Sequence, residues 1–496
     1  MLKTIKQNIL QWWNELDKKY FLGMLLFSSF VFFPLVSQRL TNAYDGMWTT
    51  AEYRAGGWEL SNGRWLWPVF SFLRFSLQLE PINAVVCLML VSLGVTRLHM
   101  LFKPVWMRTS CIDWLAGLCY VSNVVVGCYL SFHFIAPEYG FSLFFAMLAT
   151  EHVIRGKSAV SSIVPAAVLL ALSLGLYQTN LACFCLVLLA YFLLLLFRNG
   201  EKQKIREHIC KSLASAASGA VLYLLILKAV LWATGTVMAD YQGGADISVS
   251  GILKNLPSSV AKCYELFYRY FFGTLVKHNM LQETAVVFAL IFLCGGCRAC
   301  VQAGSAHTPE RLGKHFLWHS GAAGAAHDVH GIYGGNLAGV VLYSHVRRSG
   351  LVPAGLFLAI GQQPGGETAC DAFRKCWNKA EKALILLTAA AVVYGSVFMS
   401  AVDQQAMYEG KGENANDYAQ VGLFEKENAA TMRYSWNAVF RDLTPMQLEL
   451  CSDEVYDELI RTEEIKRMPT FPEKGSMQEI DGVYVIKISE DYLIDE

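Results

Sequence analysis

The side chains best suited to chemistry gather in one stretch, residues 38–74, which reads QRLTNAYDGMWTTAEYRAGGWELSNGRWLWPVFSFLR. It contains three carboxylates, four arginines and four tryptophans, namely Asp45, Glu52, Glu59, Arg39, Arg54, Arg64, Arg74, Trp48, Trp58, Trp65 and Trp67. A carboxylate can take a proton from a reacting hydroxyl, and a guanidinium can form two parallel hydrogen bonds with a phosphate. The composition suits recognition of an anionic head group or a sugar. It suits a belt of tryptophans and arginines at a membrane surface equally well.

Strongly apolar segments must position this stretch. Residues 20–37 precede it and residues 82–101 follow it, and each has about the length that a helix needs to cross a bilayer. The chain of 496 residues is 54% hydrophobic, and its apolar residues fall in long runs rather than in the alternating pattern of an outer-membrane barrel. We therefore expect a polytopic α-helical membrane protein in which residues 38–74 form a loop at the bilayer surface.

The apolar runs and the positive charges between them predict a topology. The expected spans are residues 20–37, 82–101, 112–132, 140–153, 161–176, 181–197, 212–233, 283–296 and 383–401. Lys and Arg gather before the first span and after every second span, and cytoplasmic loops carry an excess of these residues. The rule places the amphipathic segment 1–19 in the cytoplasm. It places loop 38–74, the link 133–139 (which breaks at Pro137) and the turn 177–180 outside.

The end of the chain, residues 402–496, differs in charge from the rest. It has 9 Lys and Arg against 21 Asp and Glu, whereas residues 1–401 have 32 against 20. Such an acidic segment does not favour nucleic acid or an anionic membrane as a partner. Helical periodicity in residues 417–443 and 452–467 and an alternating strand after the turn Asp481-Gly482 predict a small α/β domain. Because the last span, within residues 379–401, runs outward, this domain is expected to be extracytoplasmic.

Residues 299–378 differ from the rest of the chain in composition and in the length of their apolar runs. They are rich in Gly and Ala, hold six of the eleven histidines and lack a run long enough for a clear span. A histidine metal site, a cytoplasmic loop and a segment translated out of frame between two compensating indels are three interpretations. If the other reading frames of this interval encode no pair of apolar spans, the third is wrong. No metal site is expected, since the histidines lack a carboxylate second shell and the C-x2-C-x2-C run at residues 294–300 lacks a fourth ligand.

Several short motifs carry a family resemblance. They are NAYD at residues 42–45, SNGRW at 61–65, LYQ at 176–178 and MPxFPxxGS at 468–476. In this order and topology they resemble the serotype-converting, Gtr-type bacterial membrane glucosyltransferases of the GT-C superfamily. The likeness covers most of residues 20–298 and 380–490, and it fails over 299–378, where the family would have further spans. The family often shows two adjacent acids where this chain has Asp45-Gly46. The resemblance implies a GT-C-like fold with roughly 9–11 transmembrane helices.

The resemblance also implies a reaction and a set of roles. A sugar, expected to be glucose, would pass from a polyprenyl-phosphate donor to a cell-surface glycan outside the plasma membrane. Because the donor is a lipid phosphate, no nucleotide or other cofactor is implied. The implied roles are Asp45 as base, Glu52 and Glu138 as further acids, Arg64 as phosphate ligand, and Trp65 and Trp58 as sugar or lipid contacts. Asn62 would be a further substrate-binding residue, and Tyr177 and Gln178 would line the cavity. An acid solvated at the surface and a capping turn at residues 177–180 are the structural alternatives for these positions.

Two other classes of protein share some of these features. A transporter or flippase for a lipid-linked sugar also carries polar residues and broken helices in the membrane. The spans hold few charges, however, and the cluster of acids and arginines lies in a loop rather than at the bilayer midplane. An assembly protein whose acidic tail binds a partner is the other alternative. Turnover of a lipid-linked sugar by the purified protein separates the enzyme from the transporter, and turnover after deletion of the tail bears on the assembly protein.

Overall fold

The computed structural model describes residues 10–38, 40, 53–104, 110–197, 202–239, 390, 393–398, 400–402, 404–405 and 451–487. The chain divides into two compact units, residues 1–432 and 433–496. The expected span at 283–296, the anomalous segment 299–378 and the expected helix at 417–443 lie outside the described residues.

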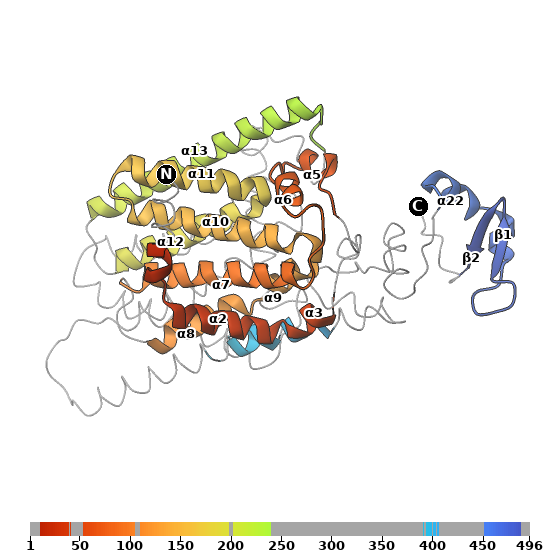
Figure 1. Ribbon diagram of the computed structural model, residues 1–496, viewed down its shortest axis with the longest axis horizontal. Coiled ribbons are helices and arrows are strands. Elements are labelled where there is room, and N and C mark those ends of the chain that lie inside the picture. The colour runs from red at the N-terminus through yellow and green to blue at the C-terminus, as the bar shows by residue number, and fades with distance from the viewer. Residues whose placement is uncertain are drawn as a thin grey trace, which may run out of the picture. The chain divides into compact units, whose positions relative to one another are not determined.

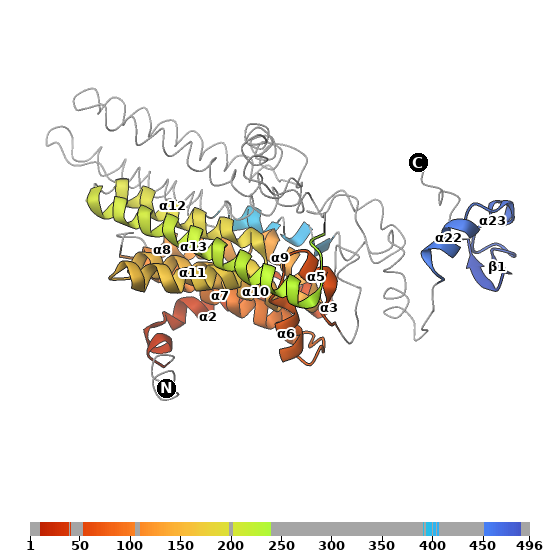
Figure 2. The same cartoon turned by 90° about the horizontal axis from the view of Figure 1, so that it is seen from above.

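The first unit is a bundle of helices. Its longer elements are α2 (Lys18–Val31), α3 (Phe33–Gln38), α7 (Ile82–Phe102), α8 (Ser110–Val121), α9 (Val124–Ser131), α10 (Ala136–Arg155), α11 (Ala159–Leu176), α12 (Leu181–Phe197) and α13 (Lys202–Thr234). Helix α10 packs along α7 on one side and α11 on the other, and α13 packs along α11 (Figures 1 and 2). Ser142 and Ser173 donate to each other's main-chain carbonyls at 2.8 and 2.7 Å, which holds α10 close against α11.

Within the described residues, four helical stretches are long and apolar enough to cross a membrane. They are Ile82–Phe102, Asp113–Ser131, Ala159–Leu176 and Gln203–Thr234. This finding supports a helical membrane protein, with four such stretches over the part of the chain where the sequence predicted seven spans. The remaining helices of the described bundle are either shorter, as α2 with 14 residues, or more polar, as α10 with two glutamates and an arginine.

The helices differ from the predicted segments in three places, each for an identifiable local reason. The predicted break at Pro137 is instead the first turn of α10, where proline loses no hydrogen bond because the N–H would have no helical partner. The predicted span 112–132 matches the stretch Asp113–Ser131, but its helix is interrupted between α8 and α9, where Asn123 accepts a hydrogen bond from the main-chain N–H of Val125 at 3.1 Å and starts α9. The basic stretch after α12, predicted to lie on the cytoplasmic side before the span 212–233, is helical from Lys202 onward and forms the first turns of α13.

Contacts between distant segments define two ends of the bundle. At the loop end, Leu66 N–H donates to Gly175 O at 3.0 Å, and Ala239 N–H donates to Ser61 O at 3.0 Å. The segment 53–81 therefore lies beside the C-terminal ends of α11 and α13 (Figure 1). At the opposite, basic end, Arg97 of α7 forms a buried ion pair with Glu151 of α10. The helices thus run from the basic end to the loop end.

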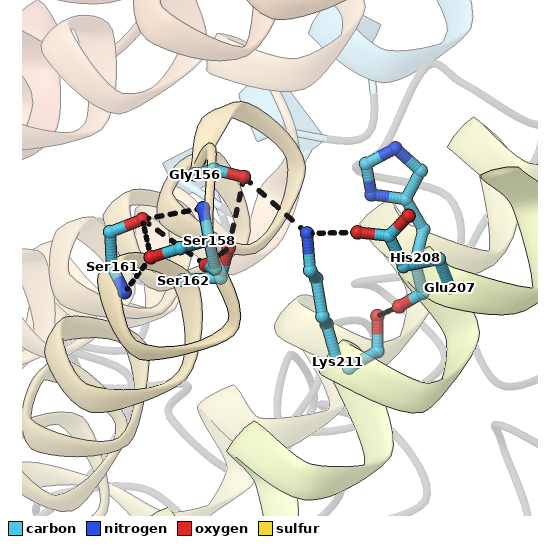
Figure 3. Close-up of polar contacts among 8 residues, drawn as sticks. Gly156, Ser158, Ser161, Ser162, Glu207, His208 and Lys211 are labelled. Carbon is cyan, nitrogen blue, oxygen red and sulfur yellow. Dashed lines mark hydrogen bonds and ion pairs between the residues drawn. The ribbon is translucent and has the colours of Figure 1, made fainter.

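Figure 3 shows polar contacts that join α10, α11 and α13 at the basic end. Ser158 caps α11, and its hydroxyl and that of Ser161 satisfy each other's main-chain N–H groups. Lys211 of α13 is almost fully buried, donates to the carbonyl of Gly156 at 3.5 Å and pairs with Glu207 at 2.6 Å. A cation at the last carbonyl groups of a helix is favourable, so Lys211 fastens the start of α13 to the end of α10.

The described part of the second unit contains two short helices and a hairpin. They are α22 (Asp453–Leu459), α23 (Glu463–Arg467), β1 (Met477–Ile480) and β2 (Val483–Ile486), with the strands antiparallel. Asp481 and Gly482 both have positive φ, 52° and 79°, as a two-residue hairpin turn requires. The predicted turn at Asp481-Gly482 and the predicted strand after it are confirmed. The single helix predicted over 452–467 is instead two, because the Thr462 side chain caps a new helix at Glu463.

Candidate active site

The segment 53–81 folds into two short helices at the loop end of the bundle. Helix α5 spans Gly57–Ser61, and α6 spans Trp67–Leu73 with Pro68 in its first turn. The turn between α5 and α6 carries Arg64 and Trp65. Two 3-10 turns face this segment, η1 (His133–Ile135) before α10 and η2 (Gln178–Asn180) before α12.

Arg64 is held against aromatic rings. The centre of its guanidinium lies 4.6 Å from the centroid of the Trp67 ring and 5.7 Å from that of Tyr177. Such cation–π contacts engage the flat faces of the guanidinium, whereas its N–H bonds lie in the plane. The Arg64 main-chain N–H donates to the carbonyl of Glu59 at 2.9 Å, which closes the end of α5. The predicted phosphate ligand is thus a half-buried arginine with a fixed orientation.

The two tryptophans beside Arg64 lie on the C-terminal end of α11. The indole N–H of Trp67 donates to Leu176 O at 2.7 Å. The ring of Trp65 occupies the space that a side chain at Gly175 would fill, so only glycine permits this close approach. The indole nitrogen of Trp65 is buried and has no hydrogen-bond partner among the described residues.

Tyrosines extend the aromatic cluster behind Arg64. The ring of Tyr177 lies 4.7 Å from that of Tyr139, which in turn stacks on Tyr129 at 4.8 Å. Tyr129 donates through its hydroxyl to the Asn180 side chain at 3.3 Å. The turn 177–180 therefore presents Tyr177 to Arg64 on one side and to the bundle core on the other.

Glu138 does not lie at the surface as an isolated solvated acid. It is fully buried in the first turn of α10 and forms an ion pair and hydrogen bond with Arg74. Arg74 also donates to Phe134 O at 2.8 Å, so it joins the end of α6 to η1. The second carboxylate oxygen of Glu138 is buried and has no hydrogen-bond partner within the described segments. The alternative interpretation of Glu138 as an acid solvated at the surface is therefore wrong.

Tyr53 and Glu59 fix the point at which the described loop begins. The Tyr53 hydroxyl donates to Glu59 Oε1 at 2.7 Å, and the main-chain N–H of Gly56 donates to Glu59 Oε2 at 2.6 Å. Tyr53 N–H also donates to Ser76 O at 2.8 Å. Burial, followed by the nearby charge of Glu59, raises the pKa of Tyr53 above its usual value, so the phenol remains protonated. Both carboxylate oxygens of Glu59 are therefore used to shape α5 and its approach.

The other predicted residues divide between the described chain and the rest. Asp45 and Glu52 lie outside the described residues. The side chain of Trp58 is 60% exposed on α5. Asn62 donates through its side-chain amide to Trp58 O at 2.9 Å, as a cap of α5. Asn62 thus stabilises the C-terminal end of α5, and the Trp58 ring lies on the surface.

A hydrogen-bonded turn precedes Arg64. Gly63 has φ +78°, a conformation that favours glycine. The Gln178 amide nitrogen donates to Asn62 O at 2.9 Å, and the Tyr223 hydroxyl of α13 donates to Gly63 O at 3.1 Å. Sequence reasoning identified Gln178 and missed Tyr223, Tyr53 and the pairing of Arg74. The local signal in the sequence that could have indicated these contacts is Gly63, because a glycine beside Arg64 suggests a close approach of another segment.

Comparison with known proteins bears on the identity of the chain. Among the described residues, no group of three His, Cys, Asp or Glu side chains is placed to hold a metal ion. No curated protein and no solved structure matches the chain. The family model described as Glucosyl transferase GtrII matches residues 40–307, which is more than half of the chain and includes every residue of the cluster around Arg64. The chain therefore belongs to the GtrII glucosyltransferase family, and the predicted family and enzyme class are confirmed.

Proposed function

We propose that the loop end binds glucose linked to a polyprenyl phosphate and transfers the glucose to a cell-surface glycan outside the plasma membrane. The observation that carries this proposal is the arginine of the SNGRW turn, oriented by the rings of Trp67 and Tyr177. A lipid-linked donor must present its phosphate at the membrane surface, and a guanidinium suits that group because it offers several N–H donors in one plane.

The reaction requires a proton acceptor and a leaving-group ligand. A hydroxyl oxygen of the acceptor glycan forms a bond to the anomeric carbon as the bond between that carbon and the phosphate oxygen breaks. The bonding electrons leave with the polyprenyl phosphate, whose charge Arg64 stabilises. The hydroxyl proton passes to a carboxylate, which we assign to Asp45. Glu52 is the second candidate. Glu138 is the third, because its ion pair with Arg74 commits one of its oxygens to the fold.

Aromatic side chains supply the remaining contacts in this proposal. The buried indole N–H of Trp65 suits a sugar hydroxyl as its acceptor, and its ring suits the apolar face of a sugar. The exposed ring of Trp58 suits the lipid near the membrane surface, where tryptophans gather. Tyr177 and Gln178 act through the turn beside Arg64.

The orientation in this proposal rests on the two ends of the bundle. Arg97, Lys103 and Arg155 lie at the basic end, where Lys103 and Arg155 pair with Asp17 and Glu151. An excess of Lys and Arg marks the cytoplasmic side. The loop end, and with it Arg64, then faces the extracytoplasmic side, where a surface glycan is present. The N-terminus is cytoplasmic and the acidic unit extracytoplasmic.

A direct assay tests the proposed donor. The purified full chain in lipid nanodiscs is mixed with synthetic polyprenyl-phosphate glucose and a surface-glycan acceptor, and release of polyprenyl phosphate is measured together with glucose in the glycan. The amount of polyprenyl phosphate released is expected to equal the amount of glucose incorporated into the glycan. A matched reaction with a nucleotide-linked glucose should give no transfer. Transfer from the nucleotide donor alone would overturn the proposal. So would movement of the lipid-linked sugar across sealed vesicles without transfer, which is the result expected of a flippase.

A further inference from the structure

Tyr223 reaches the Arg64 turn from a helix that is distant in the sequence. It lies near the middle of the C-terminal half of α13, and its hydroxyl donates to the main-chain carbonyl of Gly63 at 3.1 Å. The same hydroxyl accepts from the amide nitrogen of Gln178 at 3.1 Å. One phenol therefore joins three segments: α13, the turn η2 and the turn that carries Arg64.

Gln178 completes a closed set of hydrogen bonds around the turn. Its amide nitrogen donates to Asn62 O at 2.9 Å as well as to Tyr223. A main-chain carbonyl can only accept, so the group that faces it is the amide NH₂, and both of its hydrogens are used here. Two successive carbonyl groups, those of Asn62 and Gly63, are thus held from two different elements immediately before Arg64.

The fit of this set depends on the absence of a side chain at residue 63. A Cβ added to Gly63 would overlap the Tyr223 hydroxyl and the Gln178 amide, and the positive φ of Gly63 disfavours any other residue. The glycine, the glutamine and the tyrosine therefore form one unit whose geometry sets the direction in which the chain enters Arg64.

We propose that Tyr223 is a positioning residue for the donor phosphate: through Gly63 O and Gln178 it fixes the backbone from which Arg64 extends. This inference rests on the proposed role of Arg64 in binding that phosphate. Tyr223 itself touches no substrate in this scheme. Its effect reaches the donor through Arg64, because the guanidinium can form parallel hydrogen bonds with the phosphate only in one orientation.

The test is donor kinetics of Tyr223→Phe in the full chain in nanodiscs. Loss of the hydroxyl is expected to raise the donor KM about five- to tenfold, as the loss of one neutral hydrogen bond implies, with little change in kcat. Tyr191→Phe is the matched control, because Tyr191 lies in the same bundle but packs at 5.7 Å on Phe102, the last residue of α7, at the basic end. A merely structural role would lower the active fraction, and so kcat, without changing the donor KM.

A double-mutant cycle links the effect to Arg64. If Tyr223 acts through Arg64, the Tyr223→Phe change in an Arg64→Lys background should alter the donor KM less than twofold, since coupled residues are not additive. Fully additive effects, or an unchanged donor KM in Tyr223→Phe, would overturn this inference and leave the proposed function standing. Wild-type-like kinetics of Arg64→Lys would instead remove the proposed phosphate role. Gln178→Leu, which removes the second donor to the turn, is expected to repeat the Tyr223→Phe phenotype.

Discussion

Arg64 is contacted by residues that are near to it in the sequence and by residues that are far from it. Trp67 is three residues away, Tyr177 comes from the turn before α12, and Tyr223 acts from α13 on the preceding carbonyl. Glu138 shows a different case, since complete burial beside Arg74 commits it to an ion pair. Arginine thus lies against aromatic rings at position 64 and in a buried ion pair at position 74.

Substitution of Arg64 tests the phosphate contact at the scale of one side chain. Lysine keeps the charge but cannot form two parallel bonds to a phosphate. We expect Arg64→Lys to raise the donor KM by about 10- to 100-fold, the range for a hydrogen bond to a charged group, and Arg64→Ala to lose nearly all activity. Arg54→Lys, in the same loop and exposed, should behave as wild type. Steady-state kinetics with varied donor measure both. If Arg64 only anchors the loop, lysine will substitute without loss.

Substitution of Asp45 tests the proposed base. Removal of a positioned general base typically costs about 10²–10⁴-fold in rate, so Asp45→Asn should lower kcat by that factor. Donor binding should persist, because Arg64 remains. Glu52→Gln is the comparison from the same loop and should retain most of the activity. Near-normal turnover of Asp45→Asn, together with a large loss in Glu52→Gln, would transfer the role to Glu52.

At the scale of elements, the loop end is built from short pieces fastened to long helices. Helix α6 is tied to α11 by Trp67 and to η1 by Arg74, and α5 is tied to Tyr53 through Glu59. Neither α5, with five residues, nor α6, with seven, would be stable alone, since isolated helices of this length are marginal in water. Their tertiary contacts hold them, and so the site depends on the bundle.

The Arg74–Glu138 pair gives a prediction about that dependence. Removing one partner of a buried ion pair leaves an uncompensated charge and costs about 3–5 kcal/mol, whereas removing both can be nearly neutral. Arg74→Leu and Glu138→Leu should each lower the unfolding temperature in detergent more than the double variant does. Lys466→Met, which breaks an exposed pair with Glu463 in the second unit, should change little. A double variant that is the least stable of the three would argue against this role.

At the scale of the whole molecule, the sequence predicted the apolar helices well because their signal is local. Residues 82–101 and 181–197 were predicted as spans, and α7 and α12 occupy nearly the same positions. The site was predicted only in part. Arg64 and Gln178 lie in motifs that the sequence shows. The contacts of Tyr223 with Gln178 and of Arg74 with Phe134 arise from packing between segments far apart in sequence, and residue spacing in one chain does not reveal such contacts.

The orientation of the whole chain is testable by labelling from outside the cell. A cysteine introduced as Glu473→Cys, in a background with Cys451→Ser, should react with an impermeant maleimide on intact cells. Lys157→Cys, an exposed position at the basic end, should react only after permeabilisation. The contrast follows from the excess of Lys and Arg on cytoplasmic loops. Reaction at both positions would contradict the proposed topology, and reaction at Lys157→Cys alone would reverse it.

Helix α13 is fastened at two points along its length, and this makes the spacing between them a constraint. Lys211 holds the carbonyl of Gly156 at the basic end, and Tyr223 holds that of Gly63 at the loop end, about 18 Å further along the helix at 1.5 Å per residue. An inserted or deleted residue between them would turn one anchor by about 100° relative to the other. Both anchors could not then be satisfied, so this interval should reject single-residue insertions that a surface loop of the same length would accept.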